Sequence, residues 1–163
     1  TQIGALTTTE IGYPTTTQRE ALTVKQLKGL ERMQIRSLTD EQLNALTTTQ
    51  ISSLSGTQIG SLTSTEWTNL STTLLLALTA EQISALTATQ LGFLATDRLM
   101  EMSADQFSEI TTTTISELST ATIPYLTTTE IEALSGTQLS AFTEDQLACM
   151  TEEQLTAFEE AMV

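Results

Sequence analysis

The chain contains no histidine and a single cysteine, Cys149, among its 163 residues. Without histidine it lacks the side chain that most often serves as a general base, and its many serine and threonine hydroxyls have no activating partner. One cysteine excludes a disulfide framework, and the absence of histidine excludes a zinc site of the cysteine–histidine type. No glycine-rich phosphate loop is present either. We therefore expect a non-enzymatic protein that binds no cofactor.

Positive charge is also scarce, with six Lys and Arg against 20 Asp and Glu and a net charge of −14. No basic residue follows Arg98, whereas twelve acidic residues do, and the other five basic residues lie near the start of the chain: Arg19, Lys25, Lys28, Arg32 and Arg36. An acidic chain repels phosphate backbones, so nucleic acid is not an expected partner. The basic segment is either a solvated face or a contact for the acidic half of a second copy, which predicts head-to-tail self-assembly. Lateral assembly of copies and binding of another protein are the alternatives.

Long hydrophobic runs are missing as well. No stretch of 18 apolar residues occurs, so we expect no insertion into a membrane. Aromatic residues make up only 4% of the chain, but hydrophobic residues reach 39% and recur at regular intervals. Disorder needs low hydrophobicity or a high net charge to prevail, so this regular pattern predicts a folded chain.

The regular pattern is an eight-residue repeat that runs from Leu6 to the C-terminus without insertion or deletion. With Leu6 as position one, twenty octads follow, and position one is a large apolar residue in all of them except at Pro14. Position six is apolar in all of them except at Arg19, and Trp67 occupies this position, so we expect Trp67 in the core. A register held for twenty copies indicates a repeat architecture.

Helix-start chemistry identifies the conformation of the octad. Position two is Ser or Thr and position five is Gln or Glu together in fourteen of the twenty octads, the pattern of a capping box. Positions one and six are then the two partners of a hydrophobic staple. A continuous helix fails, because its apolar stripe would rotate by about 80° per octad. The pattern therefore predicts an all-α solenoid of one- to two-turn helices, one per octad; a β-solenoid is the alternative, favoured by threonine triplets such as 47–49.

The repeat predicts a single continuous solenoid over residues 1–163, with either three octads (24 residues) or four octads (32 residues) in each superhelical turn. Segment 95–125 is irregular, because several octads lose the capping box and Pro124 falls inside a predicted helix, which it should shorten or bend. Segment 158–163 lacks the box and is a candidate C-terminal cap.

Position eight is mostly small, as expected where neighbouring coils approach closely. Glu101, Glu109 and Glu117 break this rule in three consecutive octads. They form a candidate surface for a cation or a basic partner if the fold brings them together, and otherwise they are charges spread around the coil. Cys149 also stands at position eight, where we expect a small buried residue.

The string LTTTQISSL at residues 46–54 resembles the tandem octapeptide tracts of very large bacterial proteins described as secreted, haem-utilisation or adhesion-like. The resemblance implies an extended structural segment, a stalk, spacer or self-assembling region, of a bacterial extracellular or cell-surface protein, with a cytoplasmic location still open. It carries no functional residues across. The alternatives are a solenoid that binds a protein or another ligand, with segment 95–125 as its candidate surface, and binding of ice or glycans through threonine arrays.

Overall fold

The computed structural model describes residues 23–94 and 99–163. These residues form short helices and no strand, so the all-α prediction is confirmed and the β-solenoid alternative is wrong. The chain divides into two compact units, Thr1–Ala85 and Leu86–Val163, which we call unit 1 and unit 2.

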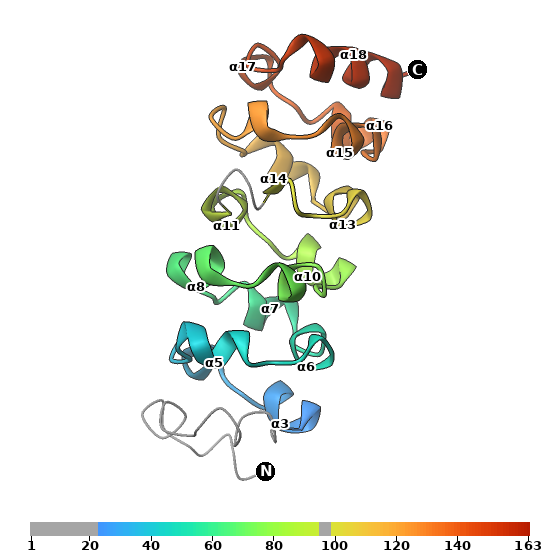
Figure 1. Cartoon of the computed structure of the whole chain (residues 1–163). Helices are drawn as coiled ribbons and strands as arrows, with labels where there is room; N and C mark the ends of the chain where they lie inside the picture. The colour runs from blue at the N-terminus through green and yellow to red at the C-terminus, as the bar shows by residue number, and fades with distance from the viewer. Residues whose placement is uncertain (1–22, 95–98) are drawn as a thin grey trace. The chain divides into compact units, whose positions relative to one another are not determined.

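The described helices are short and follow one another along the chain (Figure 1), and in unit 1 successive helices start eight residues apart. Those of unit 1 are α3 (Val24–Lys28), α4 (Arg32–Ile35), α5 (Asp40–Asn44), α6 (Thr48–Ser52), α7 (Gly56–Ile59), α8 (Ser64–Asn69), α9 (Thr72–Leu75) and α10 (Ala80–Ser84). Those of unit 2 are α11 (Ala88–Phe93), α13 (Ala104–Ser108), α14 (Thr112–Ser116), the 3-10 helix η1 (Ile123–Tyr125), α15 (Thr128–Glu132), α16 (Gly136–Leu139), α17 (Glu144–Leu147) and α18 (Glu152–Ala161).

Each described α-helix has its N-cap residue at position two of its octad. In α10, Thr79 Oγ1 accepts a hydrogen bond from the Gln82 N–H at 3.4 Å, and Gln82 Oε1 accepts one from the Thr79 N–H at 2.9 Å. This reciprocal pair is present at every described α-helix except α9 and α14. Helices this short are unstable alone, so the caps fix where each helix starts while packing between turns holds it.

The corners between helices need no glycine. The Leu46 N–H donates to the Leu43 carbonyl at 3.1 Å, which closes α5 with a tight final turn. Thr47 is then extended, with φ −75° and ψ 161°, and restarts the chain as the N-cap of α6. No described residue has a positive φ. The Leu-Thr junction therefore turns each corner in backbone conformations that any L-residue adopts.

Helices that stack on one another are three octads apart. In unit 1 the pairs in contact include α3 with α6, α4 with α7, α5 with α8, α6 with α9 and α7 with α10. In unit 2 they include α13 with α15, α14 with α16 and α15 with α18 (Figure 1). Each superhelical turn therefore contains 24 residues, and the 32-residue alternative is wrong.

Positions one and six form the core of each unit. Position six lies deepest: Ile35, Leu43, Ile51 and Ile59 have no exposed surface. Trp67 at this position is also fully buried, as predicted. Position-one leucines lie at the corners and are slightly more exposed, 7% at Leu38. The core thus runs along the inside of the coil, and most of the described octads contribute two side chains to it.

Unit 2 departs from the octad pattern at two places. Pro124 shortens its helix to the three residues of η1, as the sequence predicts. Phe158 belongs to α18, which has ten residues and stacks on α15. The Phe158 ring packs edge-on against Phe142, with ring centroids 5.9 Å apart.

Candidate functional site

The glutamine at position five makes a second set of hydrogen bonds, to the turn below. Gln82 Nε2 donates to the carbonyls of Ile51 at 2.8 Å and Leu54 at 2.7 Å. We call this arrangement the glutamine clamp. Gln58, Gln138, Gln146 and Gln154 make the same paired bonds, at 2.6–3.0 Å, to carbonyls 28 to 31 residues earlier. One buried amide therefore caps its own helix through Oε1 and joins two turns through Nε2.

Sequence reasoning assigned only the capping half of this role to position five. Glu66 and Glu130 replace the glutamine at α8 and α15, and each uses Oε2 to cap its helix while Oε1 is buried without a hydrogen-bond partner among the described residues. Thr114 replaces it at α14, and its hydroxyl donates to the Leu86 carbonyl at 3.0 Å. The sequence does show which octads differ, because Glu or Thr stands there at a position where Gln predominates.

Asn44 compensates where position five is apolar. Leu74 stands at that position in α9, and the N-cap residue Ser71 makes no side-chain capping bond. Asn44 Oδ1 instead accepts from the Ser71 N–H at 2.7 Å, and Asn44 Nδ2 donates to the Asn69 carbonyl at 2.8 Å. An amide from α5 therefore takes over the capping bond that the missing glutamine would make.

Four of the five predicted basic residues lie along α3 and α4, and we call Lys25, Lys28, Arg32 and Arg36 the basic edge. All four are exposed, and none of them forms an ion pair with a described carboxylate. Lys28 and Arg32 line an open hollow of about 460 Å³ together with residues of α7. Arg19 lies outside the described residues.

The three predicted glutamates are exposed and do not form a column. Glu109 and Glu117 are the C-cap residues of α13 and α14, and Glu101 lies in the turn before α13. Because contacting helices are three octads apart, residues from three consecutive octads lie at three different corners. Among the described residues, no group of three or more Cys, Asp or Glu side chains is arranged to hold a metal ion.

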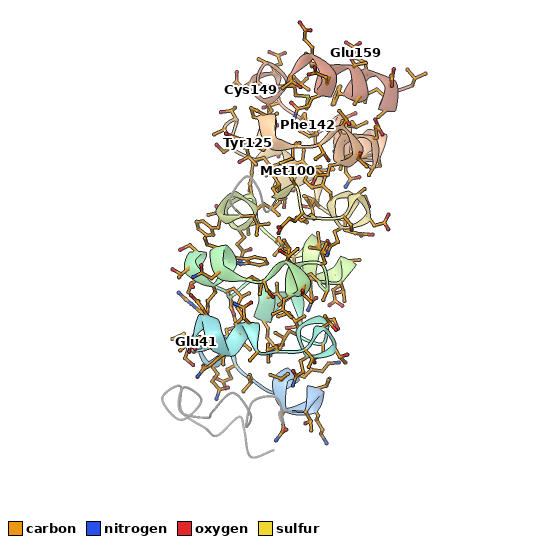
Figure 2. All side chains as sticks on the ribbon, in the orientation of Figure 1. Glu41, Met100, Tyr125, Phe142, Cys149 and Glu159 are labelled. Atoms are coloured by element: carbon orange, nitrogen blue, oxygen red, sulfur yellow. The ribbon has the colours of Figure 1, made fainter. Side chains whose placement is uncertain are left out.

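Cys149 corrects the prediction made for position eight. Its side chain is exposed (Figure 2), whereas we expected a buried one. Position eight falls at the C-terminal end of the short helices, where Glu101 and Tyr125 are also exposed but Ser61 is buried. Small residues at this position are therefore no evidence of burial.

A second hollow lies beside the irregular segment of unit 2. It has a volume of about 290 Å³, and its described lining includes Leu94, Leu99 and Tyr125. Tyr125 is 44% exposed, and Met100 on the same segment is 55% exposed (Figure 2).

None of the described helices is both long and apolar enough to span a membrane.

Stacked octads with a 24-residue turn define a helical repeat protein. In comparisons with known proteins, the family model of the ALTTAQ repeat matches residues 20–56, which include α3, α4, α5 and α6. This part of the chain is therefore similar to a repeat module. Neither the curated proteins nor the solved structures gave a match.

Proposed function

We propose that the chain is a non-enzymatic structural segment, a spacer that assembles head to tail, within a bacterial extracellular or surface protein. The observation that supports this role is the use made of buried polar groups. Every described buried polar or charged side chain except Ser61 stands at position five of an octad. These groups cap helices and join turns, so the buried polar side chains of each unit have structural roles.

Charge distribution supports self-association as part of this role. The basic edge belongs to unit 1, whereas unit 2 holds thirteen acidic residues against a single basic one, Arg98. Opposite charges on two parts of one molecule attract copies of that molecule in a heterologous contact, which repeats from copy to copy. A second copy, presenting its acidic unit to the basic edge, is therefore the partner that this chain fits.

Sedimentation velocity at two ionic strengths tests the assembly. At about 0.01 M the Debye length is about 30 Å, and at about 1 M it is about 3 Å. We expect the wild-type chain to associate at the lower ionic strength and to dissociate at the higher one. The double variant Lys28→Gln/Arg32→Gln should remain monomeric at both.

A charge-matched control separates the basic edge from net charge. Ser64→Glu/Thr65→Glu also lowers the net charge by two, and it places both acids on exposed positions of the first turn of α8, where acids are tolerated. This control should associate like the wild type. Association that persists at about 1 M salt, or that both double variants lose equally, would contradict the proposal.

The hollow beside Tyr125 favours a second candidate, a ligand-binding module. Its apolar lining and exposed aromatic ring suit an uncharged aromatic or aliphatic group. Fluorescence of the neutral dye Nile red tests this candidate: binding should weaken in Tyr125→Ala and remain in Met162→Ala, which removes another exposed apolar side chain of unit 2. Equal binding by both variants would reject it.

A further inference from the structure

Glu130 is a buried acid in a position that elsewhere holds an amide. Its side chain is 2% exposed. Oε2 accepts hydrogen bonds from the Thr127 N–H at 2.7 Å and the Thr127 hydroxyl at 2.9 Å. Oε1 is buried and has no hydrogen-bond partner among the described residues. A buried polar oxygen without a partner is costly, because it loses its hydration and gains nothing in return.

The clamp spacing in other octads predicts which groups face this oxygen. The clamp nitrogens of Gln82, Gln146 and Gln154 donate to the carbonyls 31 and 28 residues earlier, at distances of 2.6–2.9 Å. For Glu130 those carbonyls belong to Leu99 and Met102. An ionised carboxylate would therefore place a negative oxygen against two carbonyl oxygens, and all three are acceptors.

We propose that Glu130 is a proton-binding site, in which Oε1 carries a proton and donates it in a hydrogen bond to the carbonyl oxygens of the Leu99–Met102 turn. The neutral acid then reproduces the clamp: Oε2 accepts from the N-cap residue and the Oε1 hydroxyl donates to the turn below.

The charged groups around Glu130 favour the neutral form. Helices α13 and α18 pack against α15. The charged residues of these helices, of their ends and of the turn before α13 are all exposed carboxylates among the described residues: Glu101, Asp105, Glu109, Glu152, Glu153, Glu159 and Glu160, with Glu132 on α15 itself. Burial raises the pKa of the Glu130 carboxyl above its ordinary value, and the hydrogen bonds from Thr127 only partly offset this rise in pKa. No described basic side chain lies in unit 2 to oppose these effects.

The protonated Glu130 therefore makes a contribution to the free energy of unfolding that falls as pH rises. Below the ordinary pKa of glutamate, both the folded and the unfolded chain hold the proton, and the stabilisation is fully present. Between the ordinary pKa and the raised one, only the unfolded chain releases its proton, so the folding equilibrium constant falls by up to about tenfold per pH unit. Above the raised pKa both states are ionised and the loss is complete.

Three variants of the full chain test this site through urea unfolding followed by circular dichroism. Glu130→Gln supplies the amide that the clamp uses, so its folding constant relative to wild type should rise with pH across that window. Glu132→Gln removes the same charge from an exposed position of the same helix, and its ratio should stay nearly constant. Gln146→Glu places an acid in an intact clamp, and its folding constant should fall relative to wild type as pH rises.

A direct measurement complements these ratios. The side-chain carboxyl carbon of Glu130, labelled with ¹³C and assigned by its absence in Glu130→Gln, should titrate above the ordinary pKa of glutamate. A resonance that titrates at the ordinary pKa of glutamate would overturn the proposal. So would a Glu130→Gln ratio that does not change with pH. Neither result would bear on head-to-tail assembly, which is measured separately.

Discussion

Gly56 and Gly136 occupy the same place in two octads but meet different neighbours. Each follows an N-cap serine and is the first residue of its helix, α7 or α16. A Cβ atom added at Gly56 would lie 2.6 Å from the Ala85 Cβ and 3.2 Å from the Glu81 carbonyl oxygen. A Cβ added at Gly136 would meet nothing within 4 Å. Stacking of α7 on α10 is therefore close enough to require glycine at Gly56 alone.

Alanine at the two positions should have opposite effects on stability. Gly56→Ala should lower the free energy of unfolding by roughly 1–3 kcal/mol, because the added methyl group overpacks the contact with α10. Gly136→Ala should raise it by about 0.4–1 kcal/mol, because it restricts only the unfolded chain. Urea unfolding followed by circular dichroism measures both, and equal effects of the two substitutions would show that the α7–α10 contact is not tight.

Single residues also mark the limit of what the sequence predicts. The capping bond of Gln82 is predictable, because it joins residues three apart and has a known sequence pattern. The bonds from its Nε2 join residues 28 and 31 apart and depend on the number of octads in a turn. Without the number of octads in a turn, the sequence does not reveal that Glu66 and Glu130 lack the bond to the turn below. An acid at position five caps its helix as well as an amide does, so the capping pattern alone does not distinguish the two residue types.

At the scale of the element, α9 lacks the capping glutamine of its octad, and a side chain from α5 makes the capping bond instead. Leu74 cannot accept the Ser71 N–H, and Asn44 in α5 accepts it. Asn44→Ala should therefore lower the free energy of unfolding by about 1–3 kcal/mol, because the Ser71 N–H and the Asn69 carbonyl both lose a partner. The loss is measured by urea unfolding with Trp67 fluorescence, which reports on unit 1 because the chain has only one tryptophan.

A glutamine at position five of α9 should rescue the stability lost in Asn44→Ala. Leu74→Gln supplies an Oε1 that can accept from the Ser71 N–H, so it should cost less, or stabilise, in the Asn44→Ala background than in the wild type. The four chains form a double-mutant cycle with an expected coupling energy of about 0.5–3 kcal/mol. Additive effects would mean that Asn44 does not stand in for the glutamine.

The elements themselves were largely predictable, because their causes are local. Each described N-cap from Thr23 to Thr151 lies at position two, apart from that of η1. The shortening at Pro124 has a local cause in the missing N–H and the fixed φ of proline. The octad does not determine whether position eight is buried, because small residues suit both a close contact and an exposed corner. Cys149 is exposed at this position, whereas Ser61 is buried.

At the scale of the whole molecule, the two units differ most in charge. Unit 1 has seven acidic and five basic residues, whereas unit 2 has thirteen acidic residues and one basic residue. Charge of one sign destabilises a compact state through self-repulsion, and salt screens that repulsion. In a repeat protein, stability is close to a sum over turns and their interfaces, so this penalty should act mainly on the unit that carries it.

Raising the ionic strength from about 0.01 M to about 1 M should therefore stabilise unit 2 more than unit 1. Hydrogen exchange followed by mass spectrometry measures this separately on peptides from residues 23–85 and 99–163. The Lys28→Gln/Arg32→Gln variant keeps association between chains from contributing. Protection should increase with salt mainly in the second set of peptides, and an equal increase in both sets would show that repulsion within unit 2 does not limit its stability.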